Sequence, residues 1–77
     1  MIDLKFSYTS PFGGPVVEEH DTLMHFTDGV ERGIYPQKIL RCGPVNATFF
    51  ENSLHDQQFA TVQDLYNHCV NIMRGHN

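Results

Sequence analysis

The carboxyl-terminal third of the chain carries a repeat of apolar residues with the spacing of an amphipathic helix. Thr61 predicts the N-cap, Asp64 favours the positive end of the helix dipole, and Gly75 predicts the end of the helix. The helix has one apolar stripe, which must cover an apolar face formed elsewhere in the chain, because otherwise the domain would have no core. That stripe consists of Val62, Leu65, Tyr66, Cys69 and Met73.

Two other segments predict strands that supply this face. Residues 2–9 alternate between apolar and polar side chains, which is typical of a strand with one apolar side. Residues 10–15 contain two prolines and two glycines and predict a loop. Residues 16–21 permit a short extended piece, and residues 45–51 predict a further strand, because their side chains also alternate.

The middle of the chain predicts more β-structure. Asp28-Gly29 suits a type I′ turn, so we expect residues 22–27 and 30–35 to form a β-hairpin. Residues 39–42 predict a short strand, and residues 52–58 predict a polar connection. The predicted fold class is therefore α+β: a small antiparallel β-meander of four or five strands with one C-terminal amphipathic helix packed on one face. The length of 77 residues suits a single domain, 1–77.

Charge and hydropathy argue against several classes of function. Nine acidic and five basic residues give a formal net charge of −4, and the basic residues are scattered, so direct nucleic-acid binding is not expected. No segment approaches the ~20 apolar residues of a membrane span, and the amino end lacks a signal-peptide pattern. We therefore expect no membrane contact and a cytoplasmic location. Cys42 and Cys69 are then expected to be free thiols.

Five histidines and two cysteines raise the alternatives of a zinc site and of a cysteine enzyme. His20 and His25 have the spacing of half a zinc-finger pattern, but no cysteine pair accompanies them. In one strand, their odd separation would place the two rings on opposite faces. Cys42 lies beside Arg41 in a loop-like segment, yet the signatures of known cysteine hydrolases are absent. We therefore expect no metal, no cofactor and no catalytic residue, while a site assembled from distant histidines stays open.

Two aromatic side chains and an acidic cluster are the candidate partner-binding residues. Phe12 lies in a tight loop between proline and glycine residues, which would hold its ring outward; the alternative is that the loop folds this ring back onto the core. Phe49 and Phe50 are consecutive in a predicted strand, so their rings point to opposite sides of the sheet, and one helix covers one side only. The second ring is then either shielded by a loop or part of a contact surface. The predicted interface has Phe12 and Phe50 as anchors and Glu18, Glu19 and Asp21 on its rim.

These features predict a non-catalytic protein-binding module that acts by occupying a partner protein's surface, with the acidic rim steering it towards a basic surface. Small acidic domains of this build are common among the proteins of phages and mobile elements that inhibit host nucleic-acid-handling or defence enzymes, and the class is expected by that analogy. One alternative is a homodimeric or accessory structural subunit of a larger complex. A third is a small cysteine- or histidine-based enzyme.

Overall fold

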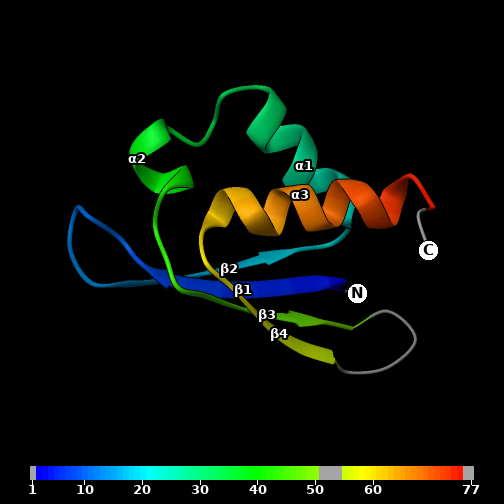
Figure 1. Cartoon of the computed structure of the whole chain (residues 1–77), viewed down its shortest axis with the longest axis horizontal. Coiled ribbons are helices and arrows are strands. Elements are labelled where there is room, and N and C mark those ends of the chain that lie inside the picture. Colours follow the sequence, from blue (N-terminus) through cyan, green and yellow to red (C-terminus); the bar gives the residue numbers. More distant parts are fainter. Residues whose placement is uncertain (1, 51–54, 76–77) are drawn as a thin grey trace.

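The computed structural model describes residues 2–50 and 55–75, which form a four-stranded antiparallel sheet with three helices on one side of it (Figure 1). The predicted α+β class is confirmed, and the C-terminal helix packs on the sheet as expected. The strands are β1 (Leu4–Thr9), β2 (Pro15–His20), β3 (Val45–Phe49) and β4 (His55–Phe59). The helices are α1 (Leu23–Glu31), α2 (Gln37–Leu40) and α3 (Val62–Met73). None of these helices is long and apolar enough to cross a membrane.

The strands lie in the order β2-β1-β3-β4, and each neighbouring pair is antiparallel. This order differs from a simple meander, because β1 lies between β2 and β3. After β2 the chain enters the helical layer, passes through α1 and α2, and returns to the sheet on the other side of β1 (Figure 1). The two edges of the sheet are therefore β2 and β4.

The predicted hairpin at residues 22–35 is wrong, because Asp28 and Gly29 lie inside α1. Thr22 caps this helix, and its Oγ1 accepts a hydrogen bond from the His25 backbone N–H at 3.0 Å. Leu23 and Phe26 on the inner face of α1 are buried. A local turn preference is weaker than the burial of two large apolar side chains, so the tertiary contacts decide the structure of this segment.

Two further segments differ from the prediction. Residues 39–42 do not form a strand, because α2 covers the first part of this segment and buries Ile39 and Leu40. The predicted polar connection at 52–58 contains most of β4, while residues 51–54 lie outside the described residues. In β4 the exposed side chains of Asp56 and Gln58 alternate with less exposed ones. An edge strand with one solvent-facing side can be this polar, because backbone pairing to its neighbour supports it.

The core lies between the sheet and the helical layer. Thr61 caps α3 through its Oγ1, which accepts from the Asp64 N–H at 3.1 Å, and Gly75 adopts a φ of 73° just beyond the helix. These cap predictions are confirmed, and three residues of the predicted helical stripe are fully buried. The buried apolar residues are Leu4, Phe6, Tyr8, Leu23, Phe26, Ile39, Leu40, Val45, Ala47, Phe49, Val62, Leu65 and Cys69.

Candidate functional site

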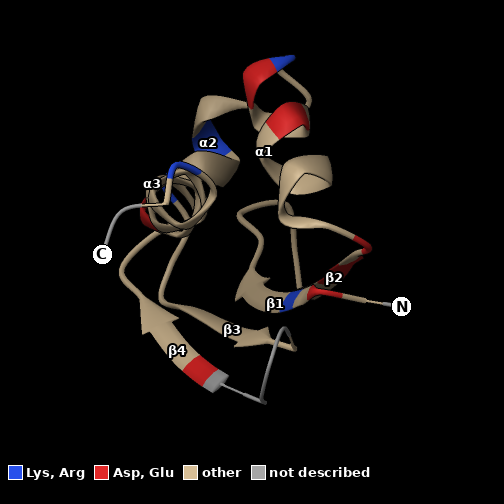
Figure 2. Ribbon diagram, turned by 90° about the vertical axis from the view of Figure 1, so that its right-hand side faces the viewer, with Lys and Arg blue, Asp and Glu red and all other residues tan. Residues whose placement is uncertain are grey.

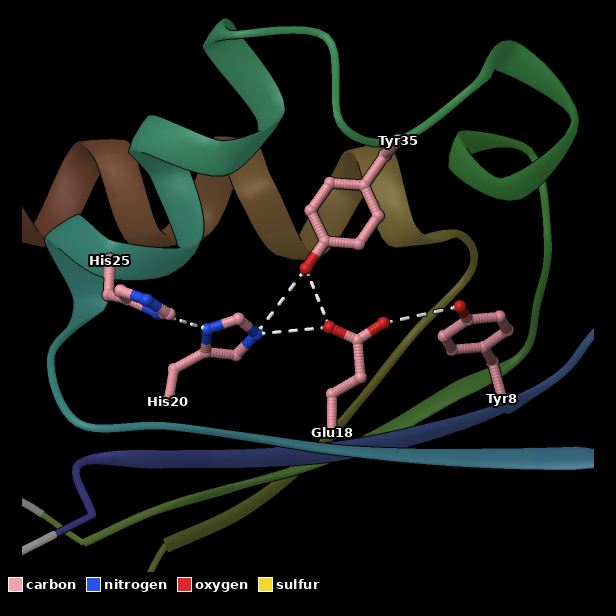
Figure 3. A network of polar contacts seen from close by, with 5 residues as sticks. All are labelled: Tyr8, Glu18, His20, His25 and Tyr35. Carbon is pink, nitrogen blue, oxygen red and sulfur yellow. Dashed lines mark hydrogen bonds and ion pairs between the residues drawn. The ribbon is translucent and has the colours of Figure 1, made fainter.

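A network of five polar side chains lies between β2 and the helical layer (Figure 3). Glu18 is at its centre. Its Oε1 accepts a hydrogen bond from the Tyr35 hydroxyl at 2.6 Å and lies 3.1 Å from His20 Nε2, while its Oε2 accepts from the Tyr8 hydroxyl at 3.3 Å. Nδ1 of His20 lies 2.8 Å from Nδ1 of His25. The network therefore joins β1, β2, α1 and the segment that leads into α2.

The donor and acceptor roles of the histidine nitrogens depend on the tautomer of each ring. An ionised Glu18 only accepts, so His20 donates from Nε2, and the Nδ1 of a neutral His20 is then an acceptor. With His20 neutral and Glu18 ionised, the hydrogen between the two Nδ1 atoms belongs to His25. The result is a continuous chain in which His25 donates to His20 and His20 donates to Glu18. Among the described residues, no buried side-chain nitrogen or oxygen lacks a hydrogen-bond partner.

The two histidines meet because α1 begins at Leu23 and turns His25 back over β2. The expectation that their rings face opposite sides holds only for a single strand, and it is wrong here. His20 is buried, and its ring stacks on Phe6 at a centroid distance of 5.7 Å with 5° between the planes. The sequence signal that points to this site is the spacing of Glu18 and His20, since residues two apart in a strand share one face.

The hydroxyl groups of Tyr8 and Tyr35 donate hydrogen bonds to Glu18 and keep their protons at neutral pH. Burial and the Glu18 carboxylate raise the pKa of Tyr8 to about 12 and also raise the pKa of Tyr35. Both phenols are therefore protonated at neutral pH. Cys69 is equally inert, because burial raises the pKa of its thiol to about 12. Cys42 is also free, and its thiol donates to the Lys38 carbonyl oxygen at 3.2 Å.

The network adjoins a depression of about 260 Å³, slightly below the roughly 300–1,000 Å³ of common small-molecule sites. Its one guanidinium, on Arg32, is already paired with Asp28 at 2.9 Å. In the described part of the chain, no group of three histidine, cysteine or acidic side chains could hold a metal ion. The lining residues are His20, His25, Asp28, Gly29, Arg32, Ile34 and Tyr35.

The predicted anchors Phe12 and Phe50 are both exposed but lie far apart. Phe12 is 70% exposed in the β1–β2 loop, with Lys38 Nζ 5.9 Å from its ring centroid, so the alternative of a ring folded onto the core is wrong. Phe50 is 39% exposed and Phe49 is buried, which confirms that the two rings point to opposite sides. The Phe50 backbone N–H donates to the Asp3 carbonyl oxygen at 3.0 Å, beside the start of β1. Because Phe12 follows the other end of β1, the structure does not bring the two anchors together.

The three predicted rim residues also separate. Glu19 and Asp21 are exposed, at the end of β2 and in the turn that follows it. Glu18 is half-buried and accepts hydrogen bonds from two tyrosines. Its side chain points towards the helices, because strand residues alternate between faces. Glu18 therefore belongs to the internal network.

A group of exposed apolar side chains lies where the start of α1 meets the end of α3, and we call Met24, Ile72 and Met73 the α1/α3 apolar cluster. These side chains are 64%, 41% and 43% exposed. With Asp3 and Leu23 they line a depression of about 340 Å³. The Thr27 hydroxyl lies 3.6 Å from the Met73 sulfur and links the two helices. Sequence patterns do not reveal this cluster, because residues 22–27 resemble a hairpin arm and Met73 falls in the predicted core stripe.

Compared with protein-family models, with curated proteins and with solved structures, the chain shows no match. Its function is therefore inferred from the geometry and chemistry of its own residues.

Proposed function

We propose that the chain is a non-catalytic protein-binding module that acts by occupying the surface of a partner protein. The α1/α3 apolar cluster is the observation that carries this proposal. Single exposed apolar residues are ordinary, but three large ones around a common depression are a feature of interaction sites. Two of the three are methionines, whose unbranched side chains adapt to the shape of a partner.

The surrounding charge favours a basic partner. Asp3 lines the depression, and the exposed Asp21 lies in the turn before α1. Figure 2 shows acidic residues along β2, in that turn and at the start of β1. Arg74, next to Met73, is a basic exception in a chain with a net charge of −4. Such an acidic rim accelerates encounter with a basic surface. Enzymes that handle nucleic acids present such surfaces, which supports the partner class expected from the sequence.

The internal network supports a binding role over catalysis. Its tyrosines are held protonated, its carboxylate accepts from several donors, and the depression beside it is small. The free thiols of Cys42 and Cys69 suit a reducing compartment such as the cytoplasm. The network then serves to hold β2 and α1 in place, and the position of α1 sets the position of Met24.

The test begins with capture of partners on the immobilised chain, their identification by mass spectrometry, and titration of one purified partner. Met24→Ser and Met73→Ser should each raise the Kd about tenfold or more, because an apolar anchor in a packed contact contributes upwards of ~1.4 kcal/mol. The melting temperature of Met24→Ser should stay close to that of the parent, because Met24 is 64% exposed. That of Met73→Ser should fall slightly, because Met73 is 43% exposed and its sulfur contacts the Thr27 hydroxyl. Val17→Ser is the matched control, since Val17 is equally exposed but lies on β2.

Two outcomes would redirect the proposal. If affinity falls with Phe12→Ala or Phe50→Ala but not with the methionine variants, the module binds through the residues expected from sequence, and the cluster is not the interface. If the purified partner binds all the variants as tightly as the parent chain, occupation of a partner through either surface is excluded.

A further inference from the structure

The outer edge of β4 carries backbone groups that the sheet does not use. The Phe50 N–H donates to the Asp3 carbonyl oxygen, which fixes the alternation of hydrogen bonds between β1 and β3. By that alternation Val45, Ala47 and Phe49 direct their backbone groups towards β4.

The register of β4 identifies its outward residues. Val45, Ala47 and Phe49 of β3 lie opposite Phe59, Gln57 and His55 of β4. The backbone groups of the three β4 residues therefore form hydrogen bonds with β3. Asp56 and Gln58 therefore direct their N–H and C=O groups away from the sheet. Among the described residues, no strand lies beyond β4 to accept them.

We propose that β4 pairs antiparallel with β4 of a second copy of this chain, so that the two sheets become one continuous sheet. The outward residues are two positions apart. A two-fold axis at Gln57 therefore places Asp56 opposite Gln58 of the second copy, and Gln58 opposite its Asp56. In this register each outward N–H of the pair meets an outward C=O.

The side chains of the same two residues are complementary in this register. Asp56 Oδ1 accepts from the Thr48 hydroxyl at 2.8 Å, which leaves Oδ2 available. Gln58 Nε2 donates to Asn46 Oδ1 at 3.3 Å, which leaves its second hydrogen available. Across the axis, the Gln58 amide can therefore donate to the Asp56 carboxylate. A register centred on Asp56 would instead place two carboxylates opposite each other, which is unfavourable.

The other edge is protected against the same pairing. The Ser10 N–H donates to the Gly14 carbonyl oxygen at 3.0 Å, and the alternation then directs Pro15, Val17 and Glu19 outward from β2. Pro15 has no N–H to donate, and Glu19 brings a negative charge to this edge. Proline and charge are the features that keep edge strands from pairing. Of the two edges, β4 is therefore the one that we expect to pair with a second copy.

The test is sedimentation equilibrium over a concentration series up to several hundred micromolar. The mass should rise with concentration towards twice the chain mass of 8.8 kDa. Gln58→Glu should raise the dimer Kd about tenfold or more, because it places a carboxylate opposite each Asp56. Adding Asp56→Lys to this variant should restore association through opposite charges. Val17→Glu, the matched change on β2, should leave the Kd unchanged.

Three results would overturn the pairing: a mass that stays at one chain throughout, a Kd unaffected by Gln58→Glu, or an equal loss with Val17→Glu. Restoration by the double variant shows that Gln58→Glu acts through charge at the edge and not through misfolding. The pairing does not depend on the α1/α3 apolar cluster, so its failure would leave the proposed partner binding standing.

Discussion

The hydrogen-bonded polar side chains of the two edge strands, β2 and β4, point to opposite faces of the sheet. On β2, Glu18 and His20 face the helices and join the network that includes Tyr35. On β4, Asp56 and Gln58 are exposed, and their side-chain partners on β3 are exposed cross-strand contacts. The polar side chains of β2 therefore tie that edge to the helical layer, whereas those of β4 bond to the neighbouring strand β3 on the exposed face of the sheet.

The apolar contacts of the two edges differ in the same way. Behind β2, Phe26 is fully buried among the rings of Phe6, His20 and Tyr35, at centroid distances of 5.0, 5.4 and 5.7 Å. Behind β4, Phe59 is only partly buried, and its ring centroid lies 6.4 Å from that of Phe49 and 5.1 Å from that of His68. The β2 side therefore has the larger share of aromatic packing, and its mutation should cost more stability.

Phe26→Ala should produce the largest effect, a loss of about 3–5 kcal/mol in the free energy of unfolding. Phe59→Ala, on the β4 side, should cost clearly less, because a half-buried ring loses less contact when truncated. Urea titration followed by circular dichroism gives both values. Equal losses would show that the two sides are packed equally well and would contradict the larger share of aromatic packing on the β2 side.

Glu18→Ala should come next, with a loss of about 1–3 kcal/mol, because the Tyr8 and Tyr35 hydroxyls and His20 all lose their acceptor. Asp56→Ala is the matched change on β4. It should stay within about 0.5 kcal/mol, since the Asp56 side chain is exposed. A loss at Asp56 as large as that at Glu18 would contradict the assignment of the structural role to the β2 network.

Alkaline pH should weaken the β2 side through its two phenols, in addition to the loss that comes from the raised pKa of the Cys69 thiol in α3, with no effect at neutral pH. The folded-state pKa of Tyr8 is raised to about 12, and that of Tyr35 is raised as well, from an unfolded value of about 10. The unfolded chain therefore releases these protons first. The contribution of both phenols is complete below pH ~10 and is lost as the pH rises through the folded pKa.

The free energy of unfolding measured from pH 9 to 12, with phenolate absorbance followed in parallel, checks this dependence. Tyr35→Phe should make the decline shallower, because it removes one of the shifted groups. Tyrosines that all ionise near pH 10 in the folded chain would show that burial and Glu18 do not hold Tyr8 and Tyr35 in the protonated form.

Parts of this fold follow directly from local sequence patterns. The alternation in residues 2–9 and 45–51 predicts β1 and β3, and the apolar stripe with Thr61 and Gly75 predicts α3. In these segments the intrinsic preference and the tertiary environment agree. Phe49 and Phe50 were likewise separable from sequence, since a strand of any register sends neighbouring side chains to opposite faces.

Local sequence patterns are therefore enough to predict the class of fold and the buried faces of β1, β3 and α3, whereas other features depend on long-range packing. Asp28-Gly29 prefers a turn locally, but burial of Phe26 against the sheet holds the segment in α1. The polar residues of β4 carry little strand signal, and pairing with β3 makes them a strand. The contact between His20 and His25, and the meeting of Met24 with Met73, each depend on where α1 packs. Periodicity reports only which side of an element is buried, whereas the position of one element against another depends on the packing of side chains far apart in the chain.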